Sequence, residues 1–268
     1  MNLSEIRNRY VAEGLDYLNA SARTCQDALL QMLGNCAMGR RVTLKGGVVI
    51  QHLSGDSRRA TLDIDLDFIR YSLEDRQIEA FIERLNEASP HFRLVIEGDI
   101  EPLRHQDYQG KRVHIYVHDH QGTSIQTKLD LGVHKNLDIE LEEYCFDLAK
   151  LEDTVTLLIN TREQIVAEKL KSLLRLGAFS TRYKDIFDMC FLVSSAQFDG
   201  ERLDALLAFS VYADASMREK NRADIHRRLE QVFSNRRYMT QLSRSKKDWI
   251  AVSADEAAQV LLKFFSEE

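Results

Sequence analysis

Aspartates alternate with apolar residues in one short segment of this sequence. Asp63, Asp65 and Asp67 occupy every second position of residues 62–69, LDIDLDFI. Residues two apart point to the same face of a β-strand, so the pattern predicts a strand with three carboxylates on one side. Like charges at this spacing repel each other, and a bound divalent cation such as magnesium would remove that repulsion. The alternative is a solvent-exposed edge strand that is kept acidic to prevent pairing with another chain.

Two further short motifs carry groups that would complete such a site. Lys45 and the pair Gly46-Gly47 fall between a predicted strand and a predicted helix. A turn of this kind exposes backbone N–H groups at a helix N-terminus, where they bind phosphate, although most glycine pairs are simple turns. Asp130 lies on another alternating segment, KLDL, and would add a third carboxylate if its strand pairs with the acidic one. Its alternative role is to neutralise a nearby basic residue.

Periodicity in the rest of the chain predicts the elements that hold these residues. Helical spacing of apolar residues covers the first forty positions, with Gly34 as the stop, and returns at residues 74–88. Three strands, HFRLVIEGDI, KRVHIYVHDH and TSIQTKLDLGV, are separated by glycine turns at 109–110 and 121–122, which favours an antiparallel meander. After about residue 160 helical periodicity replaces alternation, beginning with a helix capped by Thr161.

Length and composition limit the class of protein. The chain has 268 residues, a formal net charge of -6 and no apolar run long enough to span a membrane. Its charged start does not resemble a signal peptide and its four cysteines are widely separated, so we expect a cytoplasmic protein with reduced thiols. The order of the patterns predicts an α+β fold, with a mixed sheet and flanking helices over residues 1–155 and a helical region over residues 156–268.

Five short motifs, in this order, resemble the AbiEii/AbiGii toxin family. They are KGG at 45–47, RATLDIDL at 59–66, KLD at 128–130, AEKLKSLL at 167–174 and RYKDIFD at 182–188. Members of this family are nucleotidyltransferase-like proteins related to the DNA polymerase β superfamily, and they include the MenT toxins. The motifs extend from about residue 44 to residue 192, and the last seventy residues match none of them.

The resemblance implies roles for the residues of the predicted sheet. Gly46 and Gly47, preceded by Lys45, would hold a nucleoside triphosphate. Asp63 and Asp65 would bind Mg²⁺, and the family's further acidic position corresponds to Asp130, which would complete the metal site near the attacking hydroxyl.

Position 47 departs from the broader superfamily, which has a serine after the first glycine. The glycine removes one hydroxyl contact to phosphate, so the backbone N–H groups and Lys45 become the expected phosphate ligands. AbiEii-type sequences commonly have two glycines here, and the departure therefore does not imply an inactive protein.

In the C-terminal half, the resemblance implies that Lys169 and Asp185 take part in catalysis, with nucleotide contacts from Lys169, Arg182, Lys184 and Asp188. We expect Lys169 on the polar side of its helix, where it can reach a phosphate; the alternative is a solvated surface lysine. Asp185 and Asp188 are three residues apart and therefore share a helix face. Their alternative roles are a capping acid and a salt-bridged surface acid.

The segment from Arg218 to Lys247 has a large surplus of lysine and arginine within an acidic chain. Such a surplus suits a partner with a phosphate backbone, and the alternative is a solvated helix face. Resemblance to the MenT toxins implies tRNA as the acceptor, with nucleotides added to its 3′ end. The toxin class implies a cognate antitoxin and a role in abortive infection.

Together these observations predict a magnesium-dependent nucleotidyltransferase, the toxin of a toxin–antitoxin system, that transfers a nucleotide from an NTP to RNA. One alternative is a nucleotidyltransferase that modifies a protein or a small molecule. The other is a non-catalytic nucleic-acid-binding module with the same fold.

Overall fold

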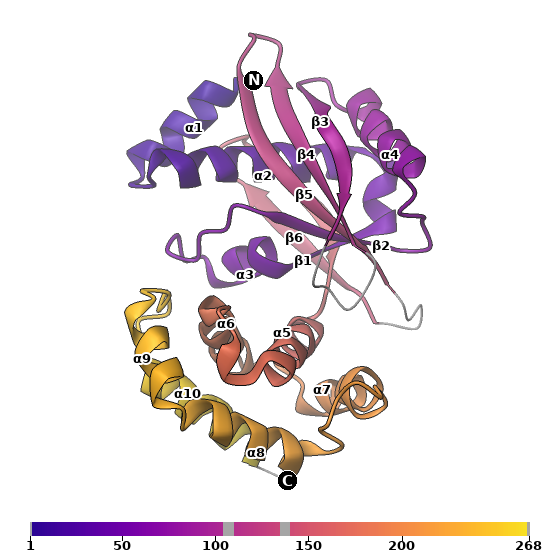
Figure 1. The fold of residues 1–268 in the computed structure, drawn as a ribbon. Helices are drawn as coiled ribbons and strands as arrows, with labels where there is room; N and C mark the ends of the chain where they lie inside the picture. Colours follow the sequence, from indigo (N-terminus) through magenta and orange to yellow (C-terminus); the bar gives the residue numbers. More distant parts are fainter. Residues whose placement is uncertain (1, 104–109, 135–139, 267–268) are drawn as a thin grey trace. The chain divides into compact units, whose positions relative to one another are not determined.

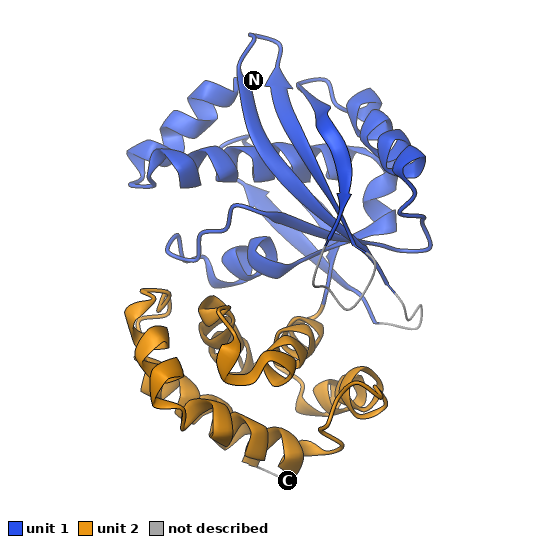
Figure 2. Ribbon diagram, in the orientation of Figure 1, with its two compact units in different colours: residues 1–160 blue, residues 161–268 orange. Residues whose placement is uncertain are grey.

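The chain forms two compact units in the computed structural model, which describes residues 2–103, 110–134 and 140–266. Unit 1 is Met1–Asn160 and unit 2 is Thr161–Glu268 (Figure 2). Of the two expected glycine turns, the one at 121–122 is present, with Gly122 at φ 86°, whereas Gln109 lies outside the described residues. Over these described ranges, no helix has both the length and the apolar character needed to cross a membrane.

Unit 1 is built on one seven-stranded mixed sheet (Figure 1). The order of its strands is β3-β4-β5-β2-β1-β7-β6. The strands β3, β4 and β5 form the predicted antiparallel meander, whereas β2 pairs in parallel with β5, and β1 in parallel with β7. The bounds are β1 (Val42–Lys45), β2 (Ile64–Phe68), β3 (Phe92–Pro102), β4 (Lys111–Asp119), β5 (Ser124–Val133), β6 (Glu142–Leu148) and β7 (Asp153–Ile159).

Unit 1 has four α-helices among its described residues. They are α1 (Leu3–Ala12), α2 (Tyr17–Asn35), α3 (Gly46–Ser54) and α4 (Asp75–Ala88), with a 3₁₀ turn at Ala37–Arg41. The helix α2 packs against β5, β6 and β7, α3 against β1 and β2, and α4 against β3, whereas α1 packs against α2 (Figure 1). The apolar side of β2 lies in the core, where the ring of Phe68 meets that of Phe81 in α4 with centroids 5.1 Å apart. A one-residue shift of β2 would place its aspartates in this core, so burial fixes the register.

The acidic strand β2 lies in the interior of the sheet, between β5 and β1. The interpretation of this segment as a solvated edge strand is therefore wrong. Aspartate is a poor strand former, so its repeated use in β2 is unfavourable by itself. Neighbouring strands cover both edges of β2, and the partly buried charges on its polar side therefore need compensation from other residues or from a ligand.

Two features of unit 1 differ from the sequence prediction. Gly34 does not stop the first long helix, because α2 continues to Asn35. A Cβ atom at Gly34 would lie 2.6 Å from Cγ1 of Val155, so the glycine allows α2 and β7 to approach closely. The hairpin β6–β7 was not predicted, although Val155, Leu157 and Ile159 alternate as buried strand positions.

Unit 2 is helical, as predicted. Its helices are α5 (Arg162–Leu176), α6 (Tyr183–Val193), α7 (Gly200–Leu207), α8 (Arg222–Phe233), α9 (Arg236–Arg244) and α10 (Ala254–Ser266), with a 3₁₀ turn at Gly177–Phe179 and a π-helical turn at Ala208–Tyr212. The predicted cap of α5 is a complete capping box formed by Thr161 and Gln164. The helix α8 begins at Arg222, inside the basic segment, and the side chain of Asn221 caps it. The predicted α+β class, with a mixed sheet followed by a helical C-terminal region, is confirmed.

Candidate active site

Strand pairing in unit 1 places three of the predicted site residues side by side. Lys45 at the end of β1 is the register partner of Asp65 in β2, and Asp65 is the register partner of Asp130 in β5. Register partners on neighbouring strands project from the same face of a sheet. The condition that the sequence left open for Asp130, that its strand lies beside the acidic one, is therefore met.

The glycine pair begins α3 directly above this face. Gly46 has φ 65°, and a Cβ atom there would lie 2.3 Å from Oδ2 of Asp65. A Cβ atom at Gly47 would lie 2.5 Å from Oγ1 of Thr61. Lys45, in the N-cap position, makes no side-chain capping hydrogen bond. The first N–H groups of α3 thus lie next to the carboxylate of Asp65, at the end of the helix that attracts negative charge.

Lys45 forms a buried ion pair with Asp67, the third carboxylate of the acidic strand, to which the family resemblance assigns no role. Its Nζ lies 2.9 Å from Oδ2 of Asp67, and the two residues are 5% and 4% exposed. The other carboxylate oxygen of Asp67, Oδ1, is buried and has no hydrogen-bond partner among the residues that the structure describes. The sequence did contain a signal for this ion pair, because the alternation places Asp67 on the same strand face as Asp65. Lys45 lies on the adjacent strand and can reach that face.

Two further cations pair with Asp130 and Asp63. Arg112 in β4 donates from Nε and Nη2 to the two oxygens of Asp130, both over 2.7 Å. These hydrogen bonds raise the pKa of Arg112 above its ordinary value. Lys128 lies 3.0 Å from Oδ1 of Asp63, which precedes β2 and is partly exposed. Arg112 and Lys128 were not predicted as site residues, although Lys128 is two positions from Asp130 and so shares its face.

The oxygen atoms on this face fit a divalent cation. Magnesium prefers hard oxygen ligands and usually takes one or two protein carboxylates, with water and substrate phosphates as its other ligands. Asp65 and Asp130 supply two carboxylates on adjacent strands, and Oδ1 of Asp67 is a buried oxygen that no described residue meets with a hydrogen bond. In the described part of the chain, no group of three or more His, Cys, Asp or Glu side chains is arranged to hold a metal ion.

Unit 2 contains the second group of predicted residues, gathered around Lys169 of α5. Its Nζ lies 2.5 Å from Oδ1 of Asp185 and 2.9 Å from Oδ2 of Asp188, both in α6. Arg182 donates from Nε to the other oxygen of Asp185 over 2.5 Å. Lys184 lies in the first turn of the same helix and is half-buried.

The environment of Lys169 differs from the sequence prediction. The residue is only 7% exposed, and its ammonium group binds two carboxylates, so it is not a solvent-facing lysine on a polar helix side. Asp185 and Asp188 do share a helix face, but both are buried rather than serving as a cap and a surface acid. Burial works to raise the pKa of Asp185, but Lys169 and Arg182 outweigh it and hold that pKa below its ordinary value.

A tryptophan adds a neutral donor to this cluster. The indole Nε1 of Trp249 donates to Oδ1 of Asp188 over 3.0 Å. The sequence analysis placed no functional residue after Lys247, and a lone tryptophan among surface residues carries no local signal of such a contact.

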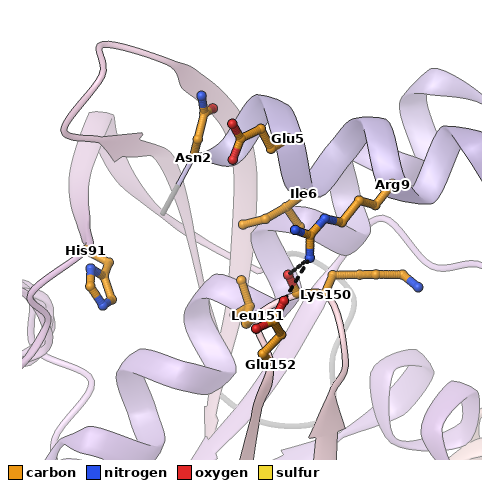
Figure 3. Close-up of a pocket in the computed structure, with 8 residues that line it drawn as sticks. All are labelled: Asn2, Glu5, Ile6, Arg9, His91, Lys150, Leu151 and Glu152. Atoms are coloured by element: carbon orange, nitrogen blue, oxygen red, sulfur yellow. Dashed lines mark hydrogen bonds and ion pairs between the residues drawn. The ribbon is translucent and has the colours of Figure 1, made fainter.

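A pocket of about 270 Å³ lies elsewhere in unit 1, beside α1 (Figure 3). Its lining includes Arg9, His91 and Lys150, and Arg9 donates to the backbone oxygen of Lys150. None of the predicted site residues lines it.

The mixed sheet with its flanking helices and helical C-terminal region is consistent with a nucleotidyltransferase-like fold. The family model of the nucleotidyl transferase AbiEii toxin, type IV toxin–antitoxin system, matches residues 27–258, and the chain belongs to this family. The match extends well beyond residue 192, where the recognisable motifs end, and so includes α7, α8 and α9. A search of curated proteins finds no match to the chain.

Proposed function

We propose that this nucleotidyltransferase toxin uses Mg²⁺ to transfer a nucleotide from an NTP to RNA, with the 3′ end of tRNA as the acceptor. The observation that carries the proposal is the row of Lys45, Asp65 and Asp130 across three neighbouring strands, beside the glycine turn. Phosphoryl chemistry depends mainly on positioning and on electrostatic stabilisation, and this row supplies groups for both.

Each predicted site residue of unit 1 has a defined task in this proposal. Asp65 and Asp130 would hold magnesium, with Asp63 joining them when it leaves Lys128. The metal supplies charge neutralisation at the reacting phosphate. The N–H groups of Gly46 and Gly47 would bind the triphosphate, as the start of α3 attracts anions.

Lys45 and Arg112 neutralise Asp67 and Asp130 before substrate arrives, since each pairs with one of these carboxylates. In such a site, the metal or the substrate would take the place of an existing ion-pair partner. The carboxylates of Asp67 and Asp130 would then keep a counter-charge while the substrate binds. Asp130 is the expected base for the attacking hydroxyl, because it lies next to Asp65, the other carboxylate that would hold the metal.

In unit 2, we assign Lys169, Arg182 and Lys184 the part in nucleotide transfer that the family resemblance implies. Asp185 and Asp188 hold the ammonium group of Lys169 in place. Charge neutralisation by cations is a major part of phosphoryl-transfer catalysis, so loss of the Lys169 ammonium should lower the rate even when the fold is intact.

The basic segment supports an RNA acceptor, and the structure separates it into two parts. In α8, Arg222 pairs with Asp204 and stacks on Phe264, and Arg227 pairs with Asp224. In α9 and the residues after it, the basic side chains are exposed and form no salt bridge with any described residue; they are Arg236, Arg237, Arg244, Lys246 and Lys247. Unpaired exposed cations favour a phosphate backbone as partner.

The first test is transfer from each of four α-labelled NTPs into total RNA. Wild-type protein with Mg²⁺ should label a tRNA-sized band, and EDTA should abolish the label until magnesium is restored. Asp65→Asn keeps the size of the side chain but removes its charge, and we expect at least about a hundredfold loss of transfer. Asp99→Asn, an exposed aspartate of β3, is the matched control and should transfer at the wild-type rate.

Other outcomes would identify the alternatives. Label in a protein or a small molecule, but not in RNA, would overturn the RNA acceptor and retain the reaction class. Equal transfer by wild type and Asp65→Asn would overturn the assignment of the site. Binding of RNA without binding of any NTP would favour the non-catalytic module.

A further inference from the structure

Trp249, the only tryptophan in the chain, shares a carboxylate with Lys169. It lies between α9 and α10, is 5% exposed, and packs its ring against Phe191 with centroids 5.1 Å apart. Its indole Nε1 donates to Oδ1 of Asp188, and the Nζ of Lys169 lies 2.9 Å from Oδ2 of the same residue. The fully buried carboxylate of Asp188 thus connects an indole on one segment to an ammonium group on another.

The orientation of this carboxylate depends on both of its donors. A buried oxygen that loses its hydrogen-bond donor is costly, so the carboxylate rotates if another donor becomes reachable. Rotation would move Oδ2 away from Lys169. A lysine side chain is flexible, so the position of its ammonium group is decided by the acceptors around it.

We propose that Trp249 is a positioning residue that orients Asp188 and thereby fixes the ammonium group of Lys169. The inference rests on the proposed function, in which Lys169 takes part in nucleotide transfer. It also gives a role to the segment that follows α9, where the sequence contains no recognisable motif. The same segment contains the exposed residues Lys246 and Lys247, which precede Trp249 by three and two positions.

The single tryptophan permits a direct test that does not depend on activity. A ¹⁵N-labelled sample gives one indole N–H signal, which belongs to Trp249. Lys169→Met keeps most of the side-chain volume but removes the charge that shares Asp188, and we expect the indole signal to shift. Lys263→Ala, an exposed lysine of α10, is the control and should leave the signal in place. An indole signal that Lys169→Met leaves unchanged would overturn the proposal.

Kinetics then test the consequence for the reaction. Trp249→Phe keeps an aromatic ring against Phe191 but removes the N–H, and we expect kcat to fall about tenfold or more while KM for the NTP changes less than about threefold. Replacement of the only tryptophan by its sulfur analogue, benzothienylalanine, removes the N–H with almost no change in shape and should have the same effect. In a Lys169→Met background, Trp249→Phe should cause little further loss, because both changes act through one group.

These results distinguish the two proposals. If the wild-type protein transfers no nucleotide, the proposed function fails, and the indole signal still decides whether Trp249 and Lys169 are coupled. If the wild type is active and the benzothienylalanine protein keeps its full kcat, the proposed function stands and the positioning role of Trp249 is overturned. A change in KM for the NTP without a fall in kcat would likewise contradict the positioning role.

Discussion

Gly46 meets two separate requirements at the start of α3. Its φ of 65° lies in the left-handed region, and Oδ2 of Asp65 occupies the space that a side chain would need. Gly55, at the other end of α3, has nearly the same φ of 64° but no atom within 4 Å of the position of its Cβ. A substitution at Gly55 therefore tests backbone strain alone, whereas a substitution at Gly46 tests backbone strain together with displacement of the Asp65 carboxylate.

We predict that Gly46→Ala and Gly55→Ala each lower the free energy of unfolding by about 1–2 kcal/mol, the cost of a left-handed alanine. Gly46→Ala should also lower nucleotide transfer at least about tenfold, because it displaces the carboxylate that would hold magnesium. Gly55→Ala should transfer at the wild-type rate. Denaturant unfolding and the transfer assay check both effects, and equal transfer by the two variants would contradict the role of Asp65.

At the scale of the single residue, the sequence predicted the types of group but not their partners. The motifs placed Lys45, Asp65 and Asp130 in one site, and strand pairing brings these three residues together. The pairing of Lys45 with Asp67 and of Asp130 with Arg112 depends on side chains from other strands, which no local pattern specifies.

At the scale of the element, a buried acid joins the first two helices. The hydroxyl of Tyr10 in α1 donates to Oδ2 of Asp27 in α2, and Nε of Arg23 lies 3.5 Å from the other oxygen. Burial raises the pKa of Asp27 to about 6, although Arg23 and the hydrogen bond from Tyr10 act in the opposite direction.

This raised pKa predicts a pH dependence of stability. Between pH 3.8 and about 6 the folded state binds a proton at Asp27 that the unfolded state has released, so stability falls as the pH rises through this range. We expect the loss to be on the order of 1–3 kcal/mol. Denaturant unfolding of wild type and Asp27→Asn checks the prediction: the stability of the variant relative to wild type should rise from pH 4 to pH 6 and then remain level. A difference that does not vary with pH would contradict it.

The contact between α2 and β7 gives a second prediction at this scale. Gly34→Ala improves the helix propensity of α2 by about 1 kcal/mol. It also places a Cβ atom 2.6 Å from Cγ1 of Val155, and such overpacking typically costs about 1–3 kcal/mol. We expect a net loss of stability. Val155→Gly should remove the clash, because it deletes both Cγ1 and the Cβ atom of Val155, which lies 2.8 Å from the same position. The double variant should therefore be more stable than the sum of the single changes predicts, by about 1 kcal/mol in denaturant unfolding. Strict additivity would contradict the close contact.

At the scale of the whole molecule, a chain with a formal net charge of -6 carries exposed cations on α9 and the residues that follow, and these form no salt bridge within the described part of the chain. An acidic protein repels a polyanion overall, so a local group of cations must supply the attraction. Arg237 in α9 and Arg227 in α8 form a matched pair, because both are exposed but only Arg227 is paired, with Asp224.

We predict that Arg237→Ala weakens RNA binding and lowers the slope of log K against log salt by about 0.7–0.9. Arg227→Ala should change both quantities much less, because its charge is already neutralised. Binding measured at several salt concentrations tests this. Equal effects of the two variants would show that α9 is not the RNA-binding surface.

The sequence by itself determined the local features of this protein. Alternation of acids with apolar residues required a strand with a polar and an apolar side, the glycine pair required a turn into a helix, and five short motifs specified the family. Only the tertiary structure decided that β2 is an interior strand, that Lys169 is buried between two acids and that Trp249 reaches Asp188. The physical reason is that side-chain periodicity depends on neighbours along the chain, whereas ion pairing and burial depend on which distant elements pack together.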